Sequence, residues 1–208
     1  TNTLSTTTDY LARMGRRSIN FQYKHNAGQE TRIDPSVSNI VDVYMLERTY
    51  DNLYRIWLQD GGAKPTTSTS DQLRINYSGT LNPLKSLSDQ IVYHPVKYKI
   101  LFGSNAAEEL QATFKVVKNP KTNVTDAVIK TRVIAAINEF FALDNWDFGD
   151  TFYFTELAAY IHNQLAPDLL TAVIVPNQSG QGFGSLFQID SASDEIFISG
   201  ATVGDVTI

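Results

Sequence analysis

The chain has 208 residues, a formal net charge of −5 and no cysteine, and it is 42% hydrophobic and 11% aromatic. This composition supports a folded core and excludes disulfide bonds, thiolate zinc sites and cysteine nucleophiles. No run of 18 apolar residues occurs, and the polar start over residues 1–8 lacks the pattern of a secretory signal, so we expect neither a membrane span nor a signal peptide. Because the first residue is Thr1 rather than Met, we expect a piece of a longer protein.

Charge is distributed unevenly along the chain. Residues 1–100 carry 12 basic and 9 acidic side chains, whereas residues 101–208 carry 5 basic and 13 acidic ones, with no Lys or Arg after Arg132. This split indicates either a solvated acidic face or a dipolar module whose acidic end meets a basic surface on a neighbour. An acidic half repels phosphates, so nucleic acid is not an expected partner.

The first part of the chain, residues 1–90, is predicted to form a smaller α/β subdomain. Its expected elements are an entry helix or arm over 1–15, strands over 18–24 and 40–46, and a helix over 47–59. Residues 63–70 read as a polar loop, and residues 71–90 are ambiguous because Gly79 interrupts a short helical pattern. The inward stripe of the 47–59 helix follows the 3.6-residue period and consists of Tyr50, Leu53, Tyr54, Trp57 and Leu58.

The second part, residues 91–208, is predicted to form a larger α+β domain, with a mostly antiparallel sheet and helices on one face. The expected strands cover 96–102, 112–118, 151–154, 171–175, 186–189 and 195–198. A helix over 126–142 is predicted to be capped by Thr125, and a second helix is predicted to be capped by Thr155 and ended by Pro167. We expect one apolar face of the first helix to pack on the sheet that holds Ile100 and Ile174; that face consists of Ile129, Val133, Ile137 and Phe141.

The search for catalytic or ligand-binding motifs finds no strong candidate. The histidines His25, His94 and His162 do not form a pair at metal-ligand spacing on one element. Asp144, Asp147 and Asp150 recur every three residues, but a calcium loop needs acids two apart, so turn or capping roles are favoured.

The glycine-rich stretch over residues 179–184 precedes a strand-like segment instead of a helix, which favours a hairpin loop over a dinucleotide site. The glycosylation sequon that ends at Thr125 reads as a helix cap. We therefore expect no catalytic residue, no cofactor and no metal.

Two groups of residues are candidates for an interface with another protein. The first is a basic cluster of Arg13, Arg16 and Arg17, for which a solvated helix end is the alternative interpretation. The second is the aromatic pair Trp146 and Phe148, which stands in a turn. Exposed aromatic side chains often anchor partners, although loop aromatics also fold back onto a sheet.

Several stretches of the sequence resemble the C-terminal half of the iris-forming baseplate wedge proteins of T-even-like contractile-tailed phages. They are residues 33–46 (IDPSVSNIVDVYML), 95–118 and 133–175, and the most specific is residues 148–176, FGDTFYFTELAAYIHNQLAPDLLTAVIVP. The order of elements in this last stretch is also similar to that of the wider J-type baseplate family. The resemblance covers about residues 16–198.

The resemblance implies a noncatalytic virion component located in the tail baseplate and assembled in the host cytoplasm. Proteins of that family dimerise and join into a ring around the baseplate hub, so the implied partners are further copies of the chain and other wedge proteins. Two alternatives remain: a small-molecule-binding or enzymatic α+β domain with an unrecognised site, and a component of a nonviral injection machine built from similar parts.

Overall fold

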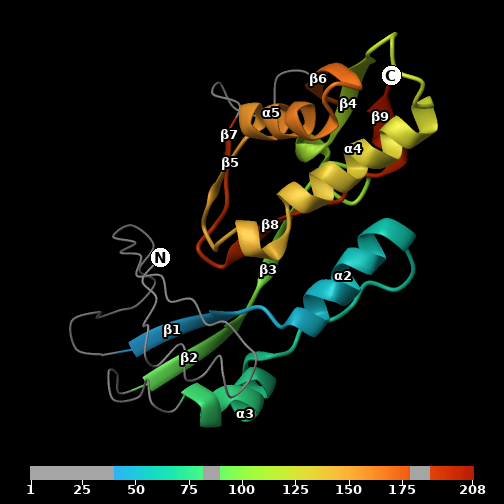
Figure 1. Ribbon diagram of the computed structural model, residues 1–208. Coiled ribbons are helices and arrows are strands. Elements are labelled where there is room, and N and C mark those ends of the chain that lie inside the picture. Colours follow the sequence, from blue (N-terminus) through green and yellow to red (C-terminus); the bar gives the residue numbers. More distant parts are fainter. Residues whose placement is uncertain (1–39, 82–89, 179–187) are drawn as a thin grey trace. The chain divides into compact units, whose positions relative to one another are not determined.

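The computed structural model describes residues 40–81, 90–178 and 188–208, and it has an α+β fold (Figure 1). The entry arm over 1–15, the strand over 18–24 and the glycine-rich loop over 179–184 were predicted in parts of the chain that lie outside the described residues. The chain divides into two compact units. The first comprises Thr1–Val43 and Thr69–His94, and the second comprises Tyr44–Ser68 and Pro95–Ile208. The prediction had placed a boundary near residue 90, so the two divisions differ over residues 44–68, which belong to the second unit.

The elements of the second unit follow the sequence pattern closely. Its helices are α2 (Arg48–Asp60), α4 (Asp126–Phe140) and α5 (Phe154–Leu165). Its strands are β3 (Lys97–Leu101), β4 (Ala112–Lys118), β5 (Thr151–Tyr153), β6 (Leu169–Pro176), β7 (Gln188–Asp190), β8 (Glu195–Ser199) and β9 (Val206–Thr207). One predicted cap is wrong, because Thr155 lies within the first turn of α5 and the N-cap position belongs to Tyr153. Among the described residues, no helix is long and apolar enough to cross a membrane.

The first unit holds helix α3 (Ser70–Leu81) between strands β1 (Ile40–Met45) and β2 (Gln90–Pro95), which pair with each other and run on past the boundary of the unit. Helix α3 continues through Gly79 with buried Leu73 and Leu81, so the glycine does not end it. A single interior glycine costs only about 1 kcal/mol relative to alanine, which burial of two leucines offsets.

The sheets of the second unit combine parallel and antiparallel pairs. In the three-stranded sheet β6–β4–β9, β6 is antiparallel to β4 and β9 is parallel to it. Strands β5 and β7 pair antiparallel, whereas β3 and β8 pair parallel. The α+β class is therefore confirmed, but the expected antiparallel majority is not. The chain passes through α4 and α5 between the partners of each parallel pair, and such long crossovers are what parallel pairing requires.

The core of the second unit lies between one face of the β6–β4–β9 sheet and helices α4 and α5 (Figure 1). Ile129, Val133, Ile137 and Phe141 are all completely buried there, which confirms the predicted face of α4. Ile174 also packs against this core. Ile100 does not, because the β3–β8 pair carries it into a smaller cluster with Tyr54 and Leu58 of α2.

Helix α2 presents a narrower apolar stripe than its sequence suggests. Tyr54 and Leu58 are buried, but Leu53 is 51% exposed, so its assignment to the inward stripe was wrong. The position that turns inward instead is Asp51, which is only 4% exposed. Because the buried side of α2 includes a polar residue, it is rotated by part of a turn from the side that the hydrophobic pattern alone predicts.

The turn after β3 brings the backbones of β3 and β8 into close contact. Phe102 and Gly103 both adopt positive φ angles, 66° and 68°. The ring of Phe102 is fully buried and makes edge contacts with Phe114, Phe141 and Phe152, so the turn delivers an aromatic side chain to the centre of the core. A positive φ is costly for phenylalanine, and burial in this cluster offsets that cost.

Candidate functional site

The turn between α4 and β5 positions the predicted aromatic pair. Asn145 Nδ2 donates to the carbonyl of Glu139 at 2.9 Å, and Trp146 Nε1 donates to the carbonyl of Phe140 at 2.8 Å. These bonds satisfy carbonyls that the end of a helix otherwise leaves without partners. Asp150 accepts a hydrogen bond from the backbone N–H of Asp147 at 2.7 Å, which is the turn role expected for these aspartates.

Trp146 is partly buried, and one part of its ring packs into the hydrophobic core. Its ring stacks on Phe141 with centroids 5.5 Å apart and meets Phe197 edge-on at 5.2 Å. Phe148 is half-buried and lies 6.1 Å from the ring of Tyr44. Much of each ring therefore contacts the rest of the protein, which favours the interpretation that these loop aromatics fold back onto it. The other predicted interface group, Arg13, Arg16 and Arg17, lies outside the described residues.

An open hollow of about 560 Å³ lies on the surface beside Trp146. Its aromatic lining comes from the end of α4, the following turn, β5 and α5, and consists of Phe140, Trp146, Tyr153 and Tyr160. Phe140 contacts both Trp146 and Tyr160, with centroids 5.6 Å and 5.4 Å apart, so three rings form a continuous apolar surface. A volume of this size lies within the range of sites that hold small ligands or a partner's side chains.

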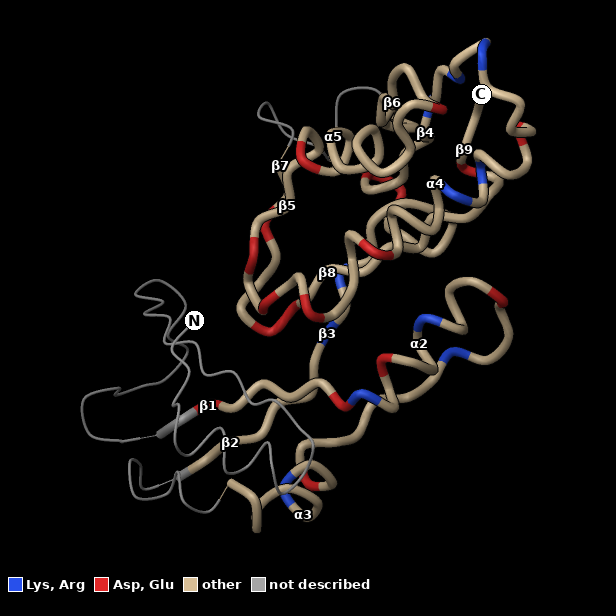
Figure 2. The backbone as a smooth tube through the Cα atoms, in the orientation of Figure 1, with Lys and Arg blue, Asp and Glu red and all other residues tan. Residues whose placement is uncertain are grey.

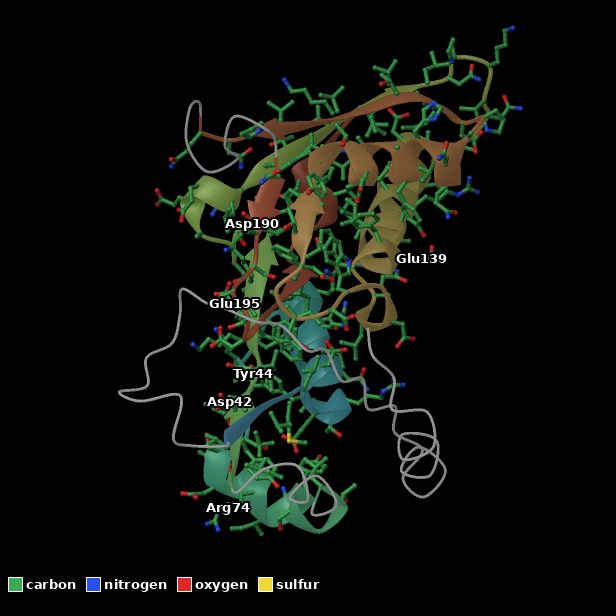
Figure 3. All side chains as sticks on the ribbon, turned by 90° about the vertical axis from the view of Figure 1, so that its left-hand side faces the viewer. Asp42, Tyr44, Arg74, Glu139, Asp190 and Glu195 are labelled. Carbon is green, nitrogen blue, oxygen red and sulfur yellow. The ribbon has the colours of Figure 1, made fainter. Side chains whose placement is uncertain are left out.

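The charge around this hollow has one sign. Asp150 and Glu156 line it, and none of its described lining residues is Lys, Arg or His. Burial, and then the negative charge of Glu139 and a hydrogen bond with it, raise the pKa of Tyr160. Acidic segments gather along the loops that join the elements of this part of the chain (Figure 2), and Glu139 is labelled where α4 ends (Figure 3). The hollow is thus aromatic and electronegative.

A buried polar network joins α2 to β3. The carboxylate of Asp51 accepts from Arg55 Nε at 3.0 Å and from the hydroxyl of Tyr98 at 2.5 Å. Burial is the main cause that raises the pKa of Tyr98, followed by the hydrogen bond to Asp51 and its charge. The network leaves Tyr98 protonated and pairs the buried charge, so its evident role is to fix α2 against the sheet.

A second, smaller hollow of about 320 Å³ adjoins this network and is lined by Asp51, Arg55 and Ser199, among others. Ser199 is buried, and its hydroxyl accepts a hydrogen bond from the backbone N–H of Ala201 at 3.1 Å. Because these polar groups already have partners within the protein, the hollow offers little that is poised for a ligand.

The histidines do not assemble a reactive centre in the part of the chain that is described. His94 Nε2 lies 2.9 Å from Asp42 in the first unit, and His162 is exposed on α5. His25 lies outside the described residues. No group of three or more potential metal-ligating side chains occurs among the described residues.

Sequence reasoning missed the two residues that most shape the polar character of these sites. Asp51 stands four residues before Arg55, which is the spacing of an ion pair on one helix, and this signal could have marked it. Glu139 occupies the last turn of α4, where an acid is electrostatically unfavourable, and that contrast could have drawn attention to it. Trp146 was singled out, and it does line the hollow.

Comparison of the chain with protein-family models and with curated proteins found no match.

Proposed function

We propose that the chain is a noncatalytic structural module of a contractile-tail baseplate wedge, which associates with itself and with other wedge proteins in the virion. The observation that carries the proposal is the resemblance of residues 148–176 to the baseplate wedge family. In the structure this segment supplies β5, α5 and β6, and its side chains Phe152, Leu157 and Ile161 are fully buried. The segment on which the resemblance is most specific is therefore the structural centre of the second unit.

The distribution of charge supports an assembly role. The second half of the chain carries 13 acidic and 5 basic side chains, and many of its acids lie along the loops between its elements (Figure 2). A head-to-tail ring brings unlike surfaces of identical subunits together, so a chain whose two halves differ in charge suits such a ring.

The alternative, an enzyme or small-molecule binder, would be favoured by titratable groups that converge on a hollow with their reactive atoms unpaired. The hollow beside Asp51 contains titratable groups, but the carboxylate of Asp51 is already paired with Arg55 and Tyr98. These contacts favour a structural role for the only buried carboxylate among the described residues.

Sedimentation of the chain at several concentrations, in low and high salt, tests self-association. We expect a dimer that buries at least about 1,200 Å² in total and that persists in high salt, because charge mainly sets orientation and association rate. Phe148→Ala should weaken the dimer, whereas Ile56→Ala, which removes a side chain that is 55% exposed on α2, should not. A chain that stays monomeric at high micromolar concentration in both salts would contradict the proposal of self-association.

A further inference from the structure

Three features of the hollow beside Trp146 favour a positively charged occupant. The first is its continuous aromatic surface, since guanidinium groups stack on the faces of tryptophan and tyrosine. The second is the pair of carboxylates on its lining, Asp150 and Glu156. The carboxylate of Glu156 is exposed and makes no hydrogen bond or ion pair with any described residue.

The third feature is the end of α4. The C-terminal end of a helix carries a partial negative charge, and basic side chains normally offset it in the last turn. The last turn of α4 contains no basic residue and instead contains Glu139, which adds a full negative charge at the same end (Figure 3). Helix α4 ends at Phe140, which lines the hollow, and Glu139 acts by its charge and a hydrogen bond on Tyr160, which also lines it. A cation from outside would remove this unfavourable arrangement.

No Lys or Arg follows Arg132 in the sequence, so α5, β5 and the turn before it cannot supply that cation themselves. A single arginine side chain satisfies all three features, because it combines a permanent charge with a flat surface that stacks on aromatic rings.

We propose that the hollow lined by Phe140, Trp146, Tyr153 and Tyr160 binds an arginine side chain presented by a different protein of the assembly. The inference deepens the proposed function, and it rests on that function in one respect: the partner is taken to be another protein of the same assembly. The hollow is a docking point for a basic segment, and the acids around it orient that segment and speed its approach.

Peptide binding followed by Trp146 fluorescence tests this inference. The chain has two tryptophans, so Trp57→Phe leaves Trp146 as the only one. The probe is the peptide acetyl-Gly-Arg-Gly-Arg-Gly-amide, and its control has citrulline, a neutral side chain of similar shape, at both arginines. We expect a saturable change in Trp146 emission with the arginine peptide and none with the citrulline peptide. Calorimetry on the unsubstituted chain gives the same comparison without Trp57→Phe.

Matched variants distinguish binding at this hollow from nonspecific attraction of the peptide to an acidic protein. Glu139→Gln and Glu156→Gln should each weaken binding by about two- to fivefold, as expected for an exposed ion pair. Glu109→Gln removes the same charge from an exposed position outside the hollow and should leave binding unchanged. Equal loss in all three variants, equal binding of the citrulline peptide, or no saturable signal would overturn the inference.

The partner is distinguished in the same experiment. If the arginine peptide dissociates dimers of the chain, the occupant is a second copy, and the assignment to a different protein is overturned. Peptide binding does not require self-association. If the chain is monomeric but binds the peptide, this inference is supported while the proposal of self-association is contradicted. If the chain forms a dimer but does not bind the peptide, this inference is contradicted while the proposal of self-association stands.

Discussion

Replacing Gly103 with alanine should lower the free energy of unfolding of the second unit by about 2–6 kcal/mol, the sum of backbone strain and overpacking. Gly103 has a φ of +68°, and an added Cβ would lie 1.9 Å from the carbonyl oxygen of Gly200. That contact is with backbone, so neither partner can rotate away. The strand pair β3–β8 would have to separate at this end, where Gly200 N–H donates to Leu101 O at 2.9 Å. Chemical denaturation followed by circular dichroism measures the change.

Gly61→Ala is the matched control for this prediction. Gly61 also has a positive φ, +77°, but a Cβ there meets no atom within 4 Å. It should therefore show only the cost of holding alanine at φ +77° and ψ −157°, a backbone conformation that is essentially confined to glycine, which is about 1–3 kcal/mol. Equal destabilisation by the two substitutions would mean that the contact between residues 103 and 200 is looser than described.

Replacing Ile137 with alanine should cost about 2–5 kcal/mol of stability. Ile137 is completely buried on the face of α4 that packs against the sheet and α5. Removing three carbons leaves a cavity that the surrounding rings, which are fixed by their contacts with one another, can fill only in part. Thermal and denaturant unfolding of the variant, compared with the unsubstituted chain, measures the loss.

Val128→Ala on the same helix provides the reference. Val128 is 43% exposed, so its truncation should change stability by no more than about 0.5 kcal/mol. If Ile137→Ala were as mild as Val128→Ala, the face of α4 that meets the core would be misassigned.

The fold of the second unit was predictable where hydrophobic period and capping agree. Strand β4 has the bounds expected from its alternating pattern, and Thr125 caps α4 by accepting from Val128 N–H. Strand pairing was less predictable, because periodicity identifies strands but not their partners. Strand β9 is two residues long, too short to give any periodic signal.

The site was predictable only in part. Turn aromatics drew attention to Trp146, but the sequence could not show that its ring is shared between the core and a surface hollow. Tyr153 and Tyr160 belong to other elements, and only the packing of β5 and α5 brings them beside Trp146. A buried acid such as Asp51 is equally hard to predict, because its burial depends on a partner, Tyr98, that is 47 residues away.

The assembly proposal and the arginine-binding hollow concern the same unit but different contacts. Self-association requires apolar contact area, since screening weakens contacts between exposed charges beyond about 10 Å at 0.1 M salt. The hollow contributes orientation and partner choice through one charged side chain. A ring component needs both kinds of contact, one with its own copies and one with the proteins that hold the ring.

The most direct test of the structural role is cryo-electron microscopy of the contractile particles made by the virus or bacterium that encodes this chain. The account predicts that the chain occupies the baseplate, with its copies in contact with one another in a ring around the hub. A particle that lacks the chain, or in which its copies touch no other copy, would contradict the account.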